Sequence, residues 1–176
     1  MQTPFPRPAI VVICGPTGVG KTRAAIAAAE RFNGEIIGAD SVQVYRRLDI
    51  GTAKPTRAER EAMPHHLVDF LEPDAPFDAR RFTQMAGALI RKLSAAGKVP
   101  FVVGGSGLYI KALLHGLFEP PAASRTLRRR LQQEAAERGG QALHRRLAAC
   151  DPESAARIHP NDSVRIVRAL EIYEAT

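Results

Sequence analysis

Apolar positions along the chain predict an alternation of buried strands and helices. The unbroken apolar run at residues 9–14 and the short, largely apolar runs at residues 35–39 and 99–103 are typical of strands in a parallel sheet. Residues 23–32 are rich in alanine and contain no glycine or proline, which favours a helix. Residues 79–96 place apolar side chains three or four positions apart, as one face of a helix does. Strands that alternate with helices in this way predict an α/β fold with a parallel sheet.

Beyond residue 103 the pattern changes to helices alone. Further helices are predicted at residues 108–115, 124–138 and 141–150, after Asp151 and after Asp162. The proline-containing stretch at residues 119–122 is typical of a hinge. We therefore expect an α/β core over residues 1–120 and a small all-helical domain over residues 121–176.

The stretch between the first predicted strand and the first predicted helix fits the phosphate-binding loop pattern. Its residues are Gly15, Pro16, Thr17, Gly18, Val19, Gly20, Lys21 and Thr22. Glycines allow backbone angles that let consecutive N–H groups point into one hollow. Lys21 and the N-terminus of the helix add positive charge, and the Thr22 hydroxyl can hold Mg²⁺. The pattern predicts a diphosphate or triphosphate site, and leaves open whether a phosphoryl group is transferred.

Two further polar positions are expected near this loop. Asp40 directly follows the second predicted strand, and ligands of open parallel sheets lie beyond the carboxyl ends of the strands. A carboxylate there can hold Mg²⁺ or accept a proton, or it can cap a turn, and its position favours a functional role. Ser106 lies in a glycine-rich turn after the third strand. Taken alone, that serine is more often a turn or cap residue.

Composition narrows the class of protein. Hydrophobic residues make up 45% of the chain, and no apolar run approaches the ~20 residues of a membrane span. The N-terminus lacks the pattern of a signal peptide. Cys14, at the end of a predicted buried strand, and Cys150, at a helix end, have no metal-binding spacing. The adjacent His65 and His66 are interpreted as structural or substrate-shaping residues. We therefore expect a cytoplasmic protein with no membrane segment and with reduced thiols.

Positive charge gathers in the predicted helical domain. The formal net charge is +7, and residues 122–146 contain seven arginines against Glu134 and Glu137. Arginine suits bidentate contact with phosphate, so this stretch is compatible with a polyanionic partner. On charge alone, a solvated helix face is the simpler interpretation.

Several blocks of sequence together resemble the tRNA dimethylallyltransferase family. They are the phosphate-binding loop and residues 39–46, 49–55, 65–69, 103–109 and 157–162. The loop occurs in many unrelated enzymes, whereas the blocks Asp-Ser-x-Gln-Val-Tyr and Asp-Ile-Gly-Thr-Ala-Lys-Pro are far more specific. The resemblance covers residue 9 to the last residue. It implies a P-loop nucleoside-triphosphate-hydrolase-like core with a parallel sheet, interrupted by a small all-helical insertion domain.

The resemblance also implies a reaction. The donor is dimethylallyl diphosphate, and the acceptor is the N6 amine of adenosine 37 in the anticodon stem-loop of tRNA. The phosphate-binding loop would hold the leaving diphosphate with Mg²⁺, and Asp40 would take a proton from the attacking amine. The base would be turned out of its stack. A kinase of a nucleotide or small molecule, with Arg128 to Arg130 over ATP, is the main alternative. A nucleic-acid-binding NTPase module is a weaker one.

Family positions further imply which residues contact tRNA. They are Asp40, Ser41, Val42, Gln43, Ser106, Arg128, Val164, Arg165, Ile166, Val167 and Arg168. The family usually has threonine where Ser106 stands and glutamine where Val164 stands. With tRNA as partner, the arginine-rich stretch is better interpreted as an RNA-facing surface. Members of the family are longer, so we expect a truncated chain or a fragment, acting as a monomer.

Overall fold

The chain divides into two compact units, Met1–Leu117 and Phe118–Thr176. The computed structural model describes residues 9–117 and 125–175, with the side chain of Arg125 left out. The predicted hinge at residues 119–122, the predicted domain boundary and the N-terminal stretch without a signal peptide lie outside these residues. Each unit is described by itself.

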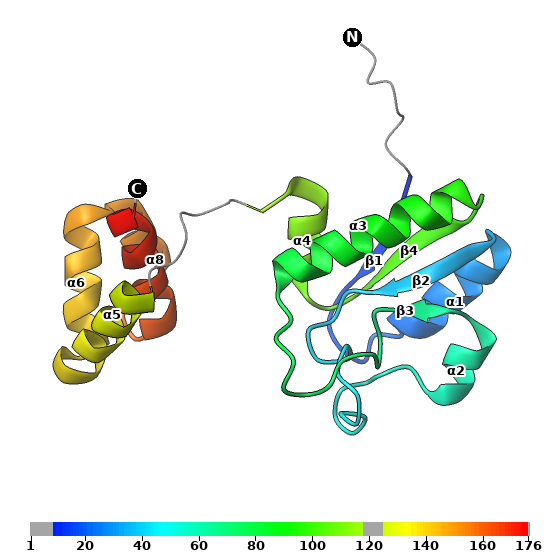
Figure 1. The fold of residues 1–176 in the computed structure, drawn as a ribbon, viewed down its shortest axis with the longest axis horizontal. Helices are drawn as coiled ribbons and strands as arrows, with labels where there is room; N and C mark the ends of the chain where they lie inside the picture. Colours follow the sequence, from blue (N-terminus) through cyan, green and yellow to red (C-terminus); the bar gives the residue numbers. More distant parts are fainter. Residues whose placement is uncertain (1–8, 118–124, 176) are drawn as a thin grey trace, which may run out of the picture. The chain divides into compact units, whose positions relative to one another are not determined.

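The first unit is built on a four-stranded sheet in which every described pairing is parallel (Figure 1). Its strands, in spatial order, are β1 (Val11–Cys14), β4 (Val99–Gly104), β2 (Gly34–Gly38) and β3 (His65–His66). The register pairs Val11 with Phe101 and Gly34 with Val99. The three predicted strands and their parallel arrangement are thus confirmed. The two-residue edge strand β3 is too short to give a periodic pattern.

Successive strand residues point to opposite sides, so both faces of this sheet carry apolar side chains. Helices pack against each face. The helices are α1 (Lys21–Arg31), α2 (Arg57–Ala62), α3 (Ala79–Ala95) and α4 (Gly107–His115). On one face, Ile36 and Phe101 pack with α1 residues such as Ala25. On the other face, Ile37 and Val102 pack with residues of α3 and α4. Helix α1 therefore lies on one face of the sheet, and the loop before it lies at the carboxyl end of β1 (Figure 1).

Helix ends in this unit follow local side-chain chemistry. The Asp78 carboxylate accepts a hydrogen bond from Arg81 N at 2.8 Å, which caps the start of α3. Helix α2 begins with a capping box between Thr56 and Glu59. The apolar pattern did not predict α2, because this helix buries no residue. The Thr-x-x-Glu spacing was the available signal.

The prediction that residues 9–14 form a buried strand is wrong on burial. Strand β1 lies at one end of the strand order, and within the described ranges it pairs only with β4. Val11 is 39% exposed and Cys14 is exposed. An apolar run shows that a strand is suited to burial, but the number of neighbouring strands decides how much of it is covered.

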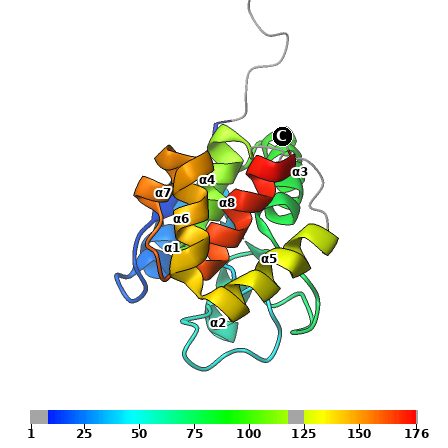
Figure 2. The ribbon, with the colours of Figure 1, turned by 90° about the vertical axis from the view of Figure 1, so that its left-hand side faces the viewer.

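The second unit is a bundle of helices (Figure 2). They are α5 (Arg125–Arg138), α6 (Gly140–Cys150), α7 (Pro152–Arg157) and α8 (Ser163–Ala175). Leu143 and Leu147, one turn apart on α6, pack with Ile166 and Leu170, one turn apart on α8, and none of the four is more than 1% exposed. No strand occurs in residues 125–175, as predicted. In the described part of the chain, no helix has both the length and the apolar character needed to cross a membrane.

Candidate active site

The phosphate-binding loop leads directly into α1. Gly18 and Gly20 both have φ of 86°, a left-handed conformation that glycine adopts at little cost. Gly20 is the N-cap of α1 and supplies no side-chain cap, so the first-turn N–H groups are left for a ligand. Lys21 Nζ donates a hydrogen bond to the Pro16 carbonyl at 2.7 Å, which keeps the ammonium over the loop. The arrangement is suited to binding a polyphosphate.

A cavity of about 280 Å³ adjoins this loop. Thr17, Lys21 and Thr22 line it from the side of the loop. Asp40 and Gln43, which follow β2, line it as well. The structure therefore brings five of the predicted phosphate-binding residues, Thr17, Gly18, Gly20, Lys21 and Thr22, to one cavity with Asp40, whereas Gly15, Pro16 and Val19 do not line it.

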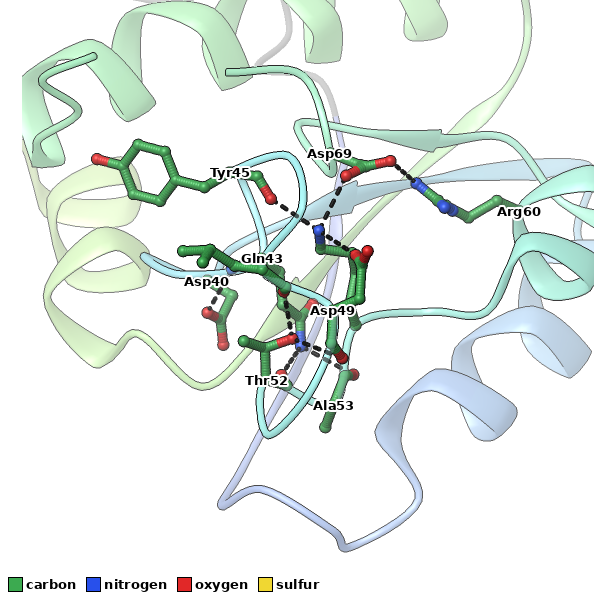
Figure 3. Close-up of polar contacts among 10 residues, drawn as sticks. Asp40, Gln43, Tyr45, Asp49, Thr52, Ala53, Arg60 and Asp69 are labelled. Atoms are coloured by element: carbon green, nitrogen blue, oxygen red, sulfur yellow. Dashed lines mark hydrogen bonds and ion pairs between the residues drawn. The ribbon is translucent and has the colours of Figure 1, made fainter. Parts of the chain in front are cut away.

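The two oxygens of Asp40 have different surroundings. Oδ1 accepts hydrogen bonds from Val42 N at 2.9 Å and from Gln43 N at 3.2 Å, so it caps the turn after β2 (Figure 3). Oδ2 receives no hydrogen bond from the described residues and lies 3.9 Å from the position of a Cβ built on Gly105. The turn-cap and functional interpretations are compatible, because the first oxygen fixes the carboxylate and the second is available to a ligand.

Two loops, the turn after β2 and the turn after β4, meet beside Asp40. Ser106 N donates to the Ala39 carbonyl at 3.1 Å, and the Ser106 hydroxyl accepts from Ser41 N at 2.9 Å. A Cβ on Gly104 would overlap the Ala39 carbonyl, so the strand ends approach as closely as their backbones allow. Ser106 is the N-cap residue of α4 but makes no side-chain cap bond. Its hydroxyl instead joins the turn after β4 to the turn after β2.

Sequence patterns did not reveal an ion cluster around a buried lysine next to the cavity. Lys54 Nζ donates to the Tyr45 carbonyl at 2.7 Å, to Asp49 at 2.6 Å and to Asp69 at 2.9 Å (Figure 3). Arg60 Nη1 donates to the other oxygen of Asp69 at 2.6 Å. We call these residues the Lys54 cluster. A single lysine in a loop of Gly, Thr and Pro has no periodicity that would predict its burial.

The charges of the Lys54 cluster stabilise one another. Burial favours the neutral amine of Lys54, but hydrogen bonds to Asp49 and Asp69 outweigh it, and the pKa of Lys54 lies above its usual value. Arg60, and then Lys54, hold the pKa of the Asp69 carboxyl below its usual range. Lys54 and Asp69 are therefore both charged at neutral pH.

The two adjacent histidines have different environments. His66 Nε2 lies 2.6 Å from Glu35 Oε2, and Glu35 also accepts from Lys98. His65 Nδ1 lies 2.7 Å from the Met63 carbonyl, while its Nε2 is buried with no partner among residues that the structure describes. His65 lines the cavity, and burial lowers its pKa. The sequence interpretation of these histidines as structural or substrate-shaping is compatible with both positions.

The oxygen donors at the cavity are suited to Mg²⁺. The Thr22 hydroxyl lines the cavity beside Lys21, at the start of α1. No group of three or more His, Cys, Asp or Glu side chains in the described ranges is placed to hold a metal ion. Mg²⁺ usually takes few protein ligands and completes its shell with phosphate oxygens and water. The residues present therefore fit a metal that is bound together with a diphosphate.

The helical unit has a groove of its own, with a volume of about 860 Å³. Arg128 and Arg168, on α5 and α8, line it together with Glu171. Arg128 holds Glu171 through two hydrogen bonds of 2.7 and 2.8 Å, and Arg168 adds a third of 3.1 Å. The Arg128 bonds lower the pKa of Glu171 even though its carboxylate is buried. Glu171 thereby fixes both guanidinium groups at the groove.

The structure separates the five predicted tRNA-contacting residues of α8. Ile166 and Val167 are 0% and 6% exposed and belong to the core of the helical unit. Val164 is 79% exposed, and Arg165 is exposed with a 3.3 Å ion pair to Asp162. Side-chain contact with RNA along this helix is therefore open to Val164 and Arg165, and in part to Arg168.

Most arginines of the basic stretch have acidic partners. Arg128, Arg130, Arg138 and Arg146 pair with Glu171, Glu174 and Glu134. Arg129 and Arg145 have no carboxylate partner among residues 9–117 and 125–175. The count of charges along the sequence could not show this division, because most of the glutamate partners lie on other helices.

Comparison with known proteins now decides the family. The family model described as IPP transferase matches residues 43–176. The chain belongs to the IPP transferase family. Two relatives are named tRNA dimethylallyltransferase. The protein of Desulfosudis oleivorans is 57% identical over 170 residues, and that of Anaeromyxobacter dehalogenans is 58% identical over 163 residues. These alignments cover 97% and 93% of this chain.

Solved structures of IPP transferases agree with this assignment. A tRNA isopentenylpyrophosphate transferase from Bacillus halodurans is 44% identical with a TM-score of 0.64, over 97% of this chain and 56% of that one. A eukaryotic dimethylallyltransferase acting on tRNA is 36% identical with a TM-score of 0.76, over 93% of this chain and 41% of that one. The kinase alternative is not favoured, since these relatives are named as dimethylallyl or isopentenyl transferases and not as kinases.

The chain spans about half the length of the curated IPP transferase relatives it matches, 54% of the two proteins described above. The family model begins at Gln43, after the phosphate-binding loop and Asp40, whereas the alignments with relatives cover nearly the whole chain.

Proposed function

We propose that the protein transfers a dimethylallyl group from dimethylallyl diphosphate to the N6 amine of adenosine 37 in tRNA and releases diphosphate. The observation that carries the proposal is the placement of Asp40 and the glycine loop at one cavity, in a chain of the IPP transferase family. Relatives named tRNA dimethylallyltransferase support the donor and the acceptor.

The phosphate-binding loop has the chemistry to bind the leaving group. Negative charge grows on the diphosphate as its bond to the dimethylallyl carbon breaks. The loop N–H groups, the N-terminus of α1 and Lys21 can stabilise that charge more strongly than that of the intact donor. Thr22 would hold Mg²⁺, which supplies further positive charge against the diphosphate when it is bound.

Asp40 has the position of a proton acceptor. In this proposal the N6 amine forms a bond to the dimethylallyl carbon, and the excess proton on nitrogen passes to Oδ2. The hydrogen bonds from Val42 N and Gln43 N to Oδ1 hold the carboxylate in one orientation. A positioned general base of this kind accelerates a reaction by about 10²–10⁴-fold. The base reaches the cavity only if it leaves its stack in the anticodon loop.

Each unit would contribute to tRNA binding. We propose that Met1–Leu117 corresponds to the predicted P-loop core and Phe118–Thr176 to the predicted helical insertion domain. Ser41 and Val42 are exposed on the first, and Val164, Arg165 and the partly exposed Arg168 on the second. Arginine contacts with phosphate would make tRNA binding sensitive to salt. The anticodon stem-loop as contact region, the monomeric state and the cytoplasmic location stay predictions.

A transfer assay with the complete gene product tests the proposal. The protein is incubated with unmodified tRNA and dimethylallyl diphosphate labelled in the dimethylallyl group. We expect label in tRNA, and none when adenosine 37 is replaced by guanosine. A parallel reaction uses ATP labelled in its terminal phosphate. Turnover of ATP with no transfer of dimethylallyl label would replace the proposal with the kinase alternative.

A further inference from the structure

The ammonium group of Lys54 has no capacity left for a ligand. Its side chain is 2% exposed, and a lysine ammonium has three N–H donors. The Tyr45 carbonyl, Asp49 and Asp69 accept one hydrogen bond each. Any contribution of Lys54 to activity must therefore act through the residues it holds.

The Lys54 cluster ties distant parts of the chain together. Asp69 lies in the loop after β3, Arg60 lies on α2, and Asp49 lies in the loop that follows β2. Two cations and two carboxylates make the cluster neutral, so the buried ammonium of Lys54 is paired with opposite charge. Asp69 N also donates to the Gln43 carbonyl at 2.9 Å, so the loop after β3 is bound to the loop after β2 through backbone groups as well.

The joined segments contain unusual backbone conformations. Arg47, Ala53, Leu67 and Asp69 have φ of 63°, 49°, 58° and 57°. Residues with a side chain rarely adopt this left-handed region, and they persist there only when surrounding contacts hold them. The Lys54 cluster supplies contacts of this kind to the loop after β2 and to the loop after β3.

A continuous series of hydrogen bonds connects the segment of Lys54 with Asp40. Ala53, the residue before Lys54, and Thr52 accept hydrogen bonds of 3.0 Å from Gln43 Nε2. Gln43 N in turn donates to Asp40 Oδ1. Figure 3 shows these bonds as one network beside the Lys54 cluster. Gln43, Ala53 and Pro55 all line the cavity that Asp40 faces.

We propose that Lys54 is a positioning residue, which fixes the cavity wall formed by Gln43, Ala53 and Pro55 and thereby holds Asp40 where its substrate amine must meet it. The proposal rests on the proposed function in its choice of substrate. It differs from a purely structural role, because it requires that turnover depends on Lys54 more than diphosphate affinity does.

The variant Lys54→Met tests this requirement. Methionine has similar length and no charge. Asp49 and one carboxylate oxygen of Asp69 therefore lose their partner, while the glycine loop is unchanged. We expect kcat to fall by about 10²-fold, the loss typical of a catalytic group displaced by about 1 Å. The KM for dimethylallyl diphosphate should change by less than about threefold, because the phosphate contacts are unchanged. Lys54→Arg, which keeps the charge, should recover part of kcat.

The matched control is Lys98→Met. Lys98 also pairs with a carboxylate, Glu35, but does not line the cavity. We expect kcat within about twofold of the unmodified protein. An equal loss of kcat in both variants would overturn the proposal, because the effect would then follow from the loss of any lysine–carboxylate pair.

Two measurements do not need turnover and separate this proposal from the proposed function. Hydrogen exchange of amides 43–54 and 69–71 should be faster in Lys54→Met, while calorimetric binding of inorganic diphosphate with Mg²⁺ should be unchanged. If the unmodified protein does not modify tRNA, the proposed function fails, and exchange still shows whether Lys54 holds the wall. Unchanged exchange and unchanged kcat in a folded variant would overturn the proposal.

Asp49→Ala provides a second variant if Lys54→Met does not fold. The Asp49 side chain is 64% exposed, so its replacement removes one partner of Lys54 without burying an unpaired charge. We expect faster exchange over residues 45–54 and a several-fold lower kcat. Exchange and kcat equal to those of the unmodified protein would again contradict the proposal.

Discussion

Asp40 shows how one side chain can serve a turn and a reaction together. Its Oδ1 accepts from two backbone N–H groups, whereas its Oδ2 accepts no hydrogen bond from the described residues, and Asp40 lines the cavity. The sequence placed Asp40 at the carboxyl edge of the sheet, which is correct. It could not show how the two oxygens divide, because that depends on the conformation of the following turn.

Asp40→Asn separates the two roles of this residue. The amide oxygen can still accept from Val42 N and Gln43 N, so the turn should survive. The amide nitrogen cannot accept a proton, and we expect single-turnover transfer to tRNA to slow by about 10²–10⁴-fold. Filter binding should show nearly unchanged affinity for tRNA. A parallel collapse of binding would make Asp40 a structural residue.

Gly104→Ala tests the close approach of the strand ends. The new Cβ would overlap the Ala39 carbonyl, and strain of this kind costs about 1–3 kcal/mol or more. We expect the free energy of unfolding, measured in urea, to fall by that amount. The control Gly107→Ala meets nothing within 4 Å and should stay within about 0.5 kcal/mol. Equal stabilities of the two variants would show that the loops can separate freely.

At the scale of elements, long segments were predicted well and short ones were not. Helix α3 lies where apolar spacing placed it, and Phe82, Ala86 and Ile90 are buried on one face. Helix α2 has no buried residue, and strand β3 pairs over only two residues. Tertiary contacts therefore define these two elements more than local sequence pattern does. The edge position of β1 was not predictable for a related reason, since no local pattern counts a strand's neighbours.

The edge strand β3 should make stability depend on pH through His65. Burial lowers the pKa of this imidazole, so below about pH 6.5 the unfolded chain takes up a proton that the folded chain does not. Stability should fall with decreasing pH by up to about 1.4 kcal/mol per pH unit until the folded-state pKa is reached. Urea unfolding at pH 7, 6 and 5 should show a smaller slope for His65→Asn. Identical slopes would contradict this assignment.

At the scale of the whole molecule, ion pairs show which positive charges counted in the sequence are already neutralised by carboxylates. The net charge of +7 and the arginine-rich stretch were compatible with a polyanionic partner, and the family resemblance favoured an RNA-facing surface. In the helical unit, Glu171 fixes Arg128 and Arg168, and Glu134 and Glu174 pair with other arginines. Charge counting was therefore compatible with a polyanionic partner, but it could not tell which guanidinium groups are already engaged. Counting charges likewise could not show that Lys54 is buried and paired with two carboxylates.

The most direct test of the account is a structure with a non-reacting donor, dimethylallyl thiodiphosphate, and Mg²⁺. The account predicts the diphosphate against the N–H groups of Gly15–Thr22, with Lys21 on its oxygens. It further predicts the dimethylallyl carbon on the side of the cavity that Asp40 Oδ2 faces. A donor bound elsewhere in the molecule, or a carboxylate that points away from the reacting carbon, would contradict the proposed function.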